Sequence, residues 1–177
     1  MTITLNGTTG VTTPGVTSTG TMSSTGIITA SQGVGGTPAF SVYQGTQQSV
    51  TSNVHTKVAF TVENFDTANC FDSTTNYRFT PTIAGYYQIN LIVFGTGNTM
   101  AYSYTSIYKN GTGYSTTLTA PQGGTNATGV NTSLIYMNGS TDYIEGYGLV
   151  SALSGAVLGN GGNSTFVMMS GYLVRSA

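Results

Sequence analysis

The chain has few charged side chains. Lys, Arg, Asp and Glu make up 5% of its 177 residues, against about 25% in ordinary globular domains. The basic residues are Lys57, Arg78, Lys109 and Arg175, and the acidic ones are Glu63, Asp66, Asp72, Asp142 and Glu145. A net charge of -1 without a basic cluster argues against binding through phosphate neutralisation. We therefore expect no nucleic-acid partner.

Cysteine, histidine and long apolar runs are also scarce. Cys70 is the only cysteine, which excludes an intramolecular disulfide and a Cys-based metal site. His55 is the only histidine and lies in a polar run, so we expect a surface loop residue rather than a base for Cys70. No stretch approaches the roughly 18 apolar residues of a membrane-spanning helix. The N-terminus lacks the features of a secretory signal, so we expect synthesis in the cytosol without membrane insertion.

Five acidic residues leave little material for catalysis. A pair of them could cleave glycosides, but we expect most to solvate loops or to pair with Arg78 and Lys109. Asp66, Asn69 and Asp72 offer oxygen ligands at three-residue intervals, without the specific spacing of an EF-hand loop. We predict no catalytic residue, no cofactor and no metal. If the protein does bind calcium, we expect it at Asp66, Asn69 and Asp72.

The residues that are abundant favour β-structure. The chain is 38% hydrophobic and 11% aromatic, and Thr, Val, Ile, Tyr and Phe all favour pleated sheet. About nine or ten short strands with turns every 8–12 residues indicate an all-β sandwich or barrel. Asn-Gly pairs predict two hairpins, one joining Tyr102–Lys109 to Tyr114–Thr119 and one joining Val130–Met137 to Thr141–Val150. We also expect a turn at Gly95–Asn98.

Residues 1–36 differ in composition from the rest. They are almost wholly Thr, Gly, Ser, Val and Ile, with no aromatic or charged side chain, and have too little apolar surface to fold alone. A flexible linker, a segment that orders on docking, and a β-stem wrapped from three copies all remain open. We predict a stem or attachment segment over 1–36 and a head over 37–177, with the boundary at Gly35-Gly36-Thr37-Pro38.

Three predicted strands carry large apolar side chains on both faces, over residues 86–94, 130–137 and 164–175. An antiparallel sandwich in water needs only one apolar face. Seven residues would lack a partner in a monomer: Ile92, Phe94, Ile135, Met137, Val167, Met169 and Leu173. Their burial would contribute roughly 10–20 kcal/mol, against an association cost of about 4–15 kcal/mol. We predict that they form an interface between copies, and that the last strand lies in the middle of a sheet.

Tyrosine and asparagine supply candidate binding residues, because rigid aromatic faces and adaptable hydrogen bonds favour recognition. The candidates for a neutral saccharide surface are Tyr102, Tyr104, Tyr114, Asn126 and Asn131, within a wider set that includes Tyr108, Tyr143 and Tyr147. The alternative is that most of these tyrosines are core or cross-strand residues.

Several landmarks in order resemble the globular C1q-like domain of the complement and tumour necrosis factor jelly-roll superfamily. They are Pro38-Ala39-Phe40-Ser41, Phe71-Asp72, Thr75, Phe79, Pro81, Gly85, Tyr87, Lys109-Asn110-Gly111 and Ser170-Gly171-Tyr172-Leu173. The family usually has Tyr at the position of Phe71 and Gly at the position of Asn76, and one extra residue lies between Asp72 and Phe79. The resemblance implies a ten-stranded jelly roll that assembles as a homotrimer, with inner-sheet strands meeting at the threefold axis.

The segment from Thr4 to Gly15 resembles parts of bacteriophage tail-fibre and other virion proteins. Together the two resemblances predict a non-enzymatic virion structural protein: a trimeric fibre or spike knob that binds a host-surface glycan, held to other virion proteins through residues 1–36. The alternatives are a capsid decoration or cement protein, a glycan-cleaving enzyme, and a secreted adhesive protein.

Overall fold

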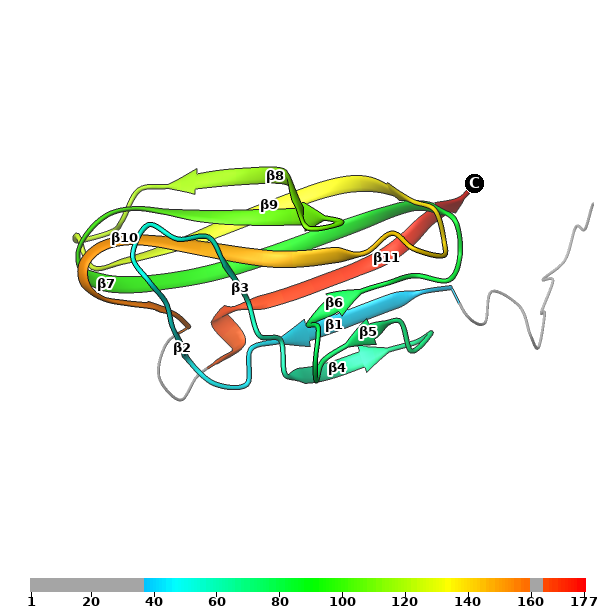
Figure 1. Cartoon of the computed structure of the whole chain (residues 1–177), viewed down its shortest axis with the longest axis horizontal. Coiled ribbons are helices and arrows are strands. Elements are labelled where there is room, and N and C mark those ends of the chain that lie inside the picture. The colour runs from blue at the N-terminus through cyan, green and yellow to red at the C-terminus, as the bar shows by residue number, and fades with distance from the viewer. Residues whose placement is uncertain (1–36, 160–163) are drawn as a thin grey trace, which may run out of the picture. The chain divides into compact units, whose positions relative to one another are not determined.

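The computed structural model describes residues 37–159 and 164–177, so the predicted stem lies outside the described residues. The described chain is all-β, with eleven strands and one short 3₁₀ helix (Figure 1). The strands are β1 (Ala39–Tyr43), β2 (Gln48–Ser49), β3 (Thr56–Lys57), β4 (Val62–Asp66), β5 (Phe71–Asp72), β6 (Arg78–Phe79), β7 (Gly85–Lys109), β8 (Thr112–Thr119), β9 (Asn126–Met137), β10 (Ile144–Leu158) and β11 (Met168–Ser176); the helix η1 is Ser164–Phe166.

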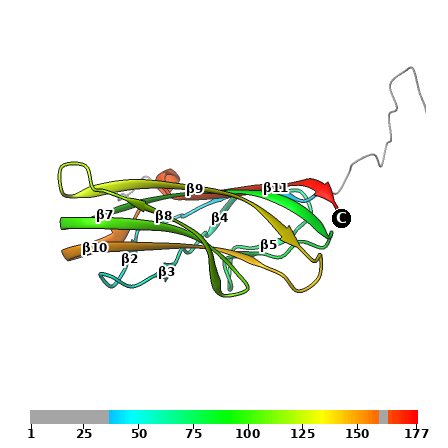
Figure 2. The same ribbon diagram turned by 90° about the horizontal axis from the view of Figure 1, so that it is seen from above.

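The strands form two layers that share β7. Its first half pairs with β11 on one side and β9 on the other, and β1 and β4 extend this first sheet beyond β11. Its second half pairs with β8 and β10, and β10 also pairs with β2, β3 and β6 in the second sheet. Figure 2 shows β9 and β11 along one side and β10, β2 and β3 along the other. The predicted sandwich is confirmed, and β11 lies between β1 and β7 as expected for a central strand.

The turn predicted at Gly95–Asn98 does not form, because the strand β7 continues through these residues. Its pairing with β10 runs from Gly95 to Lys109 with two register shifts, so the chain bends from one sheet into the other without a hairpin. A Cβ on Gly95 would lie 2.7 Å from a methyl carbon of Val150, closer than packed carbon atoms allow. The Gly-Thr-Gly sequence therefore marks a crowded bend, which the turn prediction missed.

One predicted hairpin is confirmed and one is wrong. β7 and β8 pair across Asn110 and Gly111, which have positive φ values of 53° and 75°, as a two-residue hairpin turn of this type requires. β9 and β10 are not paired with each other, because each pairs with a different half of β7. The turn at Asn138 forms, but it carries the chain from the first sheet to the second.

The chain between β2 and β6 contains only short strands. Residues 64–77 contain the end of β4 and all of β5, and residues 57–62 contain only the end of β3 and the start of β4. The count of eleven strands instead of ten follows from such short pieces and from β7, which serves both sheets.

The core lies between the two sheets. The inward face of the first half of β7 is fully buried and consists of Tyr87, Ile89, Leu91 and Val93. The Tyr87 hydroxyl donates to the Ile83 carbonyl at 2.8 Å, and burial raises the pKa of Tyr87 to about 12.

Four of the seven predicted interface residues belong to this core: Ile135, Met137, Val167 and Met169 are fully buried within one copy. The prediction that these four lack a partner within one copy was wrong, because alternation in the strands predicted over 130–137 and 164–175 does not say which face points inward. The register decides it, since β9 and β11 pair with β7 so that Ile135 and Met169 lie opposite the inward-facing Tyr87 and Leu91.

The first and last residues of the head lie at the same end of the sandwich. Leu173 donates its backbone N–H to the Pro38 carbonyl at 3.0 Å, and Ala177 donates to the Ala84 carbonyl at 3.0 Å. The bend of β7 lies at the opposite end (Figure 1). Within the described residues, no helix is long and apolar enough to cross a membrane.

A substitution at Gly171, one of the landmark residues, can test the packing between the two sheets. A Cβ there would lie 2.6 Å from Ile89 Cδ1 and 2.8 Å from a ring carbon of Phe40. We expect Gly171→Ala to lower the free energy of unfolding by about 1–3 kcal/mol through overpacking, measured by urea denaturation at one fixed protein concentration. Ser170→Ala, one residue away on the outer face, should change it by less than about 0.5 kcal/mol; equal effects would contradict the packing argument.

Candidate functional site

The outer face of the first sheet carries a band of exposed apolar side chains. Register places Tyr86 beside Tyr136, and Gln88 between Tyr172 and Leu134. Tyr172 is 51% exposed and Leu134 is 53% exposed. The apolar residues on or beside this face are Phe65, Tyr86, Ile92, Phe94, Val130, Leu134, Tyr136, Phe166 and Tyr172. A patch of this extent is typical of an interaction surface.

A row of polar side chains crosses the same face. Gln88 Nε2 donates to Thr132 Oγ1 at 2.7 Å, and that hydroxyl donates to Asn90 Oδ1 at 2.7 Å. Ser170 lies opposite Asn90, and Ser41 opposite Ser170. The face therefore combines apolar area with a row of polar groups that is partly hydrogen-bonded within one copy, and interface cores likewise combine the two.

Of the predicted interface residues, Ile92 and Phe94 lie half-buried on this outer face, and Phe94 contacts Phe166 with ring centroids 5.6 Å apart. Leu173 is half-buried and packs against the core. Ile92 and Phe94 remain candidates for the interface. Leu134, Tyr136 and Tyr172 are further candidates, which the sequence reasoning missed because it assigned their strands the opposite orientation.

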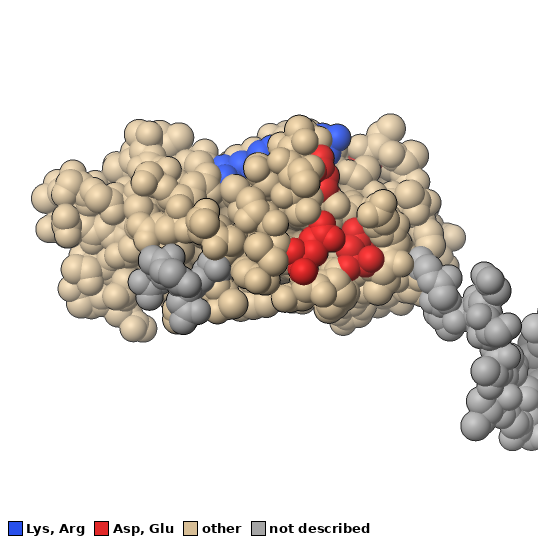
Figure 3. All heavy atoms as spheres, turned by 90° about the horizontal axis from the view of Figure 1, so that it is seen from below, with Lys and Arg blue, Asp and Glu red and all other residues tan. Residues whose placement is uncertain are grey.

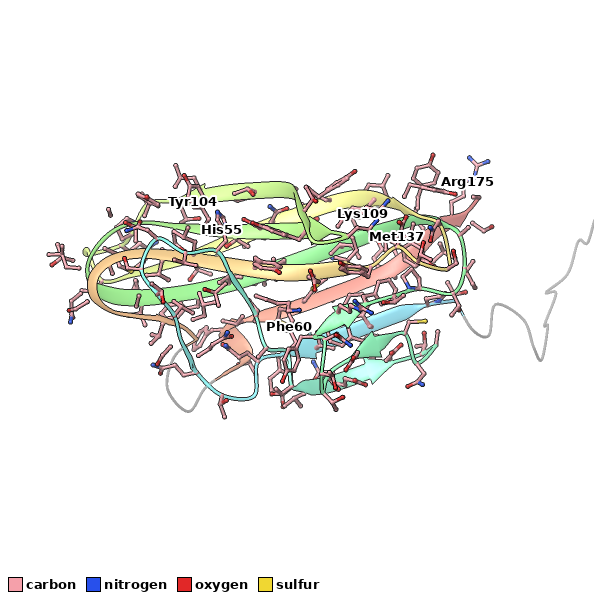
Figure 4. All side chains as sticks on the ribbon, in the orientation of Figure 1. His55, Phe60, Tyr104, Lys109, Met137 and Arg175 are labelled. Atoms are coloured by element: carbon pink, nitrogen blue, oxygen red, sulfur yellow. The ribbon has the colours of Figure 1, made fainter. Side chains whose placement is uncertain are left out.

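The outer face of the second sheet carries a different feature, which we name the His55 cluster: His55, Tyr102, Tyr104 and Tyr108. The His55 ring stacks on Tyr104 with centroids 5.6 Å apart and an interplanar angle of 18°, and it lies 6.1 Å from Tyr108. Tyr102 lies 5.3 Å from Tyr104. Figure 4 shows His55 and Tyr104 close together in the half of the head remote from Arg175.

The cluster is anchored to the sheet at both ends. The Tyr102 hydroxyl donates to Asn53 Oδ1 at 3.1 Å, and the Asn53 N–H donates to the Val150 carbonyl at 3.0 Å. At the other end Tyr108 stacks on Tyr147 with centroids 3.9 Å apart. The pKa of Tyr147 is raised mainly by burial and, to a smaller extent, by the negative charge of Glu145. These contacts hold the segment from residue 50 to residue 57 across the sheet.

The predicted binding residues separate in the structure. Tyr102 and Tyr104 join the His55 cluster. Asn131 is only 3% exposed; its side chain donates to the Thr105 carbonyl at 3.1 Å and accepts from Ser115 at 3.0 Å. It is a structural residue between the layers, and its assignment to a binding surface is wrong because every second residue of β9 points inward.

Tyr114 and Asn126 lie outside the cluster. Tyr114 is exposed on β8, with its hydroxyl 3.5 Å from the Leu134 carbonyl. Asn126 begins β9, and its carbonyl accepts from the Gln122 N–H at 2.7 Å. No contact among the described residues joins either to Tyr104, so the structure does not bring the five predicted residues into one site.

The acidic residues of the predicted calcium triplet bond to the backbone. Asp66 accepts from the N–H groups of Ala68 and Phe71, and Asp72 accepts from those of Thr74, Thr75 and Asn76. The pKa of Asp72 is held well below its usual range. The main cause is the hydrogen bonds from the Thr75 and Thr74 amides, and the bond from the Asn76 side chain adds to it. These hydrogen bonds stabilise the loop. No group of three His, Cys, Asp or Glu residues with metal-site geometry occurs in the described parts of the chain.

Lys109 and Asp142 connect the β7–β8 hairpin to the turn after β9. Lys109 Nζ donates to Asp142 Oδ2 at 2.8 Å and to the Tyr136 carbonyl at 2.7 Å. Asp142 also accepts from Asn110 Nδ2 at 2.7 Å and from the Asn138 N–H at 3.0 Å. The landmark Lys109-Asn110-Gly111 thus has a structural role. In Figure 3 the charged side chains occupy a small part of the face shown.

The fold has relatives among solved structures. The globular domain of zebrafish complement 1qA protein matches with a TM-score of 0.58 at 12% identity, over 79% of this chain and 99% of that one. PRD1 vertex protein P5 matches with a TM-score of 0.52 at 16% identity, over 80% of this chain and 99% of that one. Murine APRIL matches with a TM-score of 0.56 at 8% identity, over 77% and 98%.

The head has a C1q/TNF-like jelly-roll fold. This confirms the resemblance predicted from the landmark residues. No family profile and no curated protein sequence matches the chain. At these identities the C1q/TNF-like relatives establish the fold alone.

The Lys109–Asp142 pair predicts a specific dependence on pH. The hydrogen bond from Lys109, then that from Asn110, lowers the pKa of Asp142. A carboxyl whose pKa is lower when folded stabilises the fold above its unfolded pKa of about 3.9, and this contribution disappears as the pH falls through the folded value.

We expect Asp142→Asn to lower the free energy of unfolding by about 1–2 kcal/mol at pH 7. The difference from the unchanged protein should stay constant between about pH 5 and 8 and shrink below about pH 4, measured by urea denaturation across that range. Glu63→Gln, at an exposed position, is the control and should show no such profile. A difference that grew on acidification would contradict the assignment.

Proposed function

We propose that the chain is a non-enzymatic structural protein of a virus particle, the trimeric knob of a bacteriophage fibre or spike that contacts the host surface. The exposed apolar face of the first sheet is the observation that carries this proposal. A soluble head with nine large apolar residues on or beside one sheet face requires a partner to cover them.

A second copy of this chain is the partner that fits. The face carries little unpaired charge, because Arg175 lies at one end opposite Tyr86 and Lys109, 5.9 Å from the Tyr136 ring, is paired with Asp142. Leu134 is 53% exposed and Val130 is 56% exposed, so covering the exposed part of each would contribute roughly 0.8–1.6 kcal/mol, about half of the value for complete burial. C1q-like and APRIL structures share the fold, and a vertex protein among the relatives supports a place on a virus particle.

Residue 37 lies at one end of the head, and residues 1–36 join the head there. This end therefore suits attachment to the particle. Pro38 and the C-terminal residues lie at that end, so the bend of β7 at the other end would point away from the particle. Three copies on one rigid head would multiply weak contacts with a host through avidity.

The self-association test uses a matched pair of charge substitutions. We expect the full chain to sediment at three times its 18.3 kDa mass at micromolar concentration. Leu134→Asp should shift it to the single-chain mass, because a charge buried without a partner opposes association. Leu118→Asp, at a residue 59% exposed on β8, should leave the mass unchanged. A single-chain species of the unchanged protein would refute the proposal.

The role on the particle is tested with particles that lack the protein. A fibre or spike knob predicts intact particles that adsorb poorly to host cells. A purely stabilising decoration protein, the other arrangement the fold allows, predicts particles that break on mild heating yet adsorb normally. Heat release of nucleic acid and adsorption to whole cells, compared with and without added protein, separate the two. Normal results in both assays would exclude both roles.

A further inference from the structure

We infer that the His55 cluster on the second sheet is a binding site for an uncharged saccharide. This inference rests on the proposed role in host contact and gives that contact a place and a chemistry. It also changes the composition of the site, because His55 and Tyr108 join Tyr102 and Tyr104, whereas Asn131 is excluded by burial.

The rings of the cluster are already held in place. His55 stacks on Tyr104 and contacts Tyr108, while Tyr108 stacks on Tyr147 at 3.9 Å. Tyr102 is fixed through Asn53. A ligand that meets ordered rings does not have to order them, so more of its contact energy remains as affinity.

The same rings have polar atoms without a protein partner. Within residues 37–159 and 164–177, neither the hydroxyls of Tyr104 and Tyr108 nor the ring nitrogens of His55 take part in a hydrogen bond. His55 is exposed and both tyrosines are half-buried. Phenolic hydroxyls and a neutral imidazole both donate and accept hydrogen bonds, which complements the paired donor and acceptor character of sugar hydroxyls.

Charge indicates the class of saccharide. Three ionised residues lie near the cluster: Lys57 on the segment of His55, Lys109 next to Tyr108, and Glu145, which pairs with Tyr108 across the sheet. Lys57 bonds to Glu145 at 2.9 Å, and Lys109 bonds to Asp142 at 2.8 Å. Each of these cations is therefore paired and offers no free charge to an incoming ligand. An acidic polysaccharide would need an unpaired cation, so the site favours a neutral one.

The position of the cluster leaves it accessible in the proposed trimer. The two sheets of a sandwich turn their outer faces in opposite directions. If the first sheet covers the contact between copies, the second sheet faces outward, with Tyr104 toward the end remote from Arg175 (Figure 4).

The experiment uses affinity electrophoresis of the full chain through gels that contain a neutral glucan, mannan or galactan, or an acidic polyuronate. We expect retardation by at least one neutral polysaccharide and not by the polyuronate. The double substitution Tyr104→Phe and Tyr108→Phe removes two hydroxyls and keeps the rings, and should weaken retardation by roughly three- to tenfold or more. His55→Ala should weaken it as well.

Tyr114→Phe is the matched control, because this tyrosine is exposed on the neighbouring strand but lies outside the cluster. Retardation should be unchanged. Thermal melting and sedimentation of each variant confirm that fold and assembly are retained.

Absence of retardation by every neutral polysaccharide would overturn the inference, as would retardation by the polyuronate alone or an equal loss in Tyr114→Phe. Each of these results leaves the trimer and the virion role untouched, because sedimentation and particle assays report on those separately. Retention of binding by a single-chain species would instead support the site and refute the knob.

Discussion

The inward face of β7 is the constraint on which the rest of the head depends. Tyr87, Ile89, Leu91 and Val93 are fully buried in the first half of the strand, and Ile107 is fully buried in the second. One strand thus contributes to the core from both layers, and both layers must take their register from it. β9 and β11 pair along its first half and β8 and β10 along its second. A shift of one residue in β7 would turn both outer faces inward.

The sequence predicts the parts of this arrangement that are local. Alternation locates the buried face of β7, and Asn110-Gly111 locates a hairpin because the turn needs positive φ at both positions, as the structure has them. It does not predict partners that lie far apart along the chain. Asn138-Gly139 gives the same local signal, yet the strands on either side of it join different sheets. A Gly-Thr-Gly sequence likewise predicts a turn where the structure has a crowded bend.

The same limit explains the candidate sites. For β9 and β11 both faces are apolar, so alternation alone could not show that Ile135 and Met169 point into the core while Leu134 and Tyr172 point out. Pairing with β7 decides that question. Tyr102 and Tyr104 are predictable as aromatic residues on one face of a strand, whereas the stacking of His55 on Tyr104 joins residues 55 and 104 and has no local signature.

The two outer faces differ in the side chains they expose, and this difference supports separate roles. On the first sheet the aliphatic Leu134 is 53% exposed beside a polar row that includes groups without a partner among the described residues, such as the Tyr172 hydroxyl. A second copy brings the same apolar area and the same polar row, so it can cover the one and bond to the other, whereas a donor buried without a partner would cost about 1–3 kcal/mol. On the second sheet the His55 cluster exposes rings, and the hydroxyls of Tyr104 and Tyr108 have no partner among the described residues. The first face therefore suits a second copy of the chain, and the second suits a ligand that combines apolar contact with hydrogen bonds.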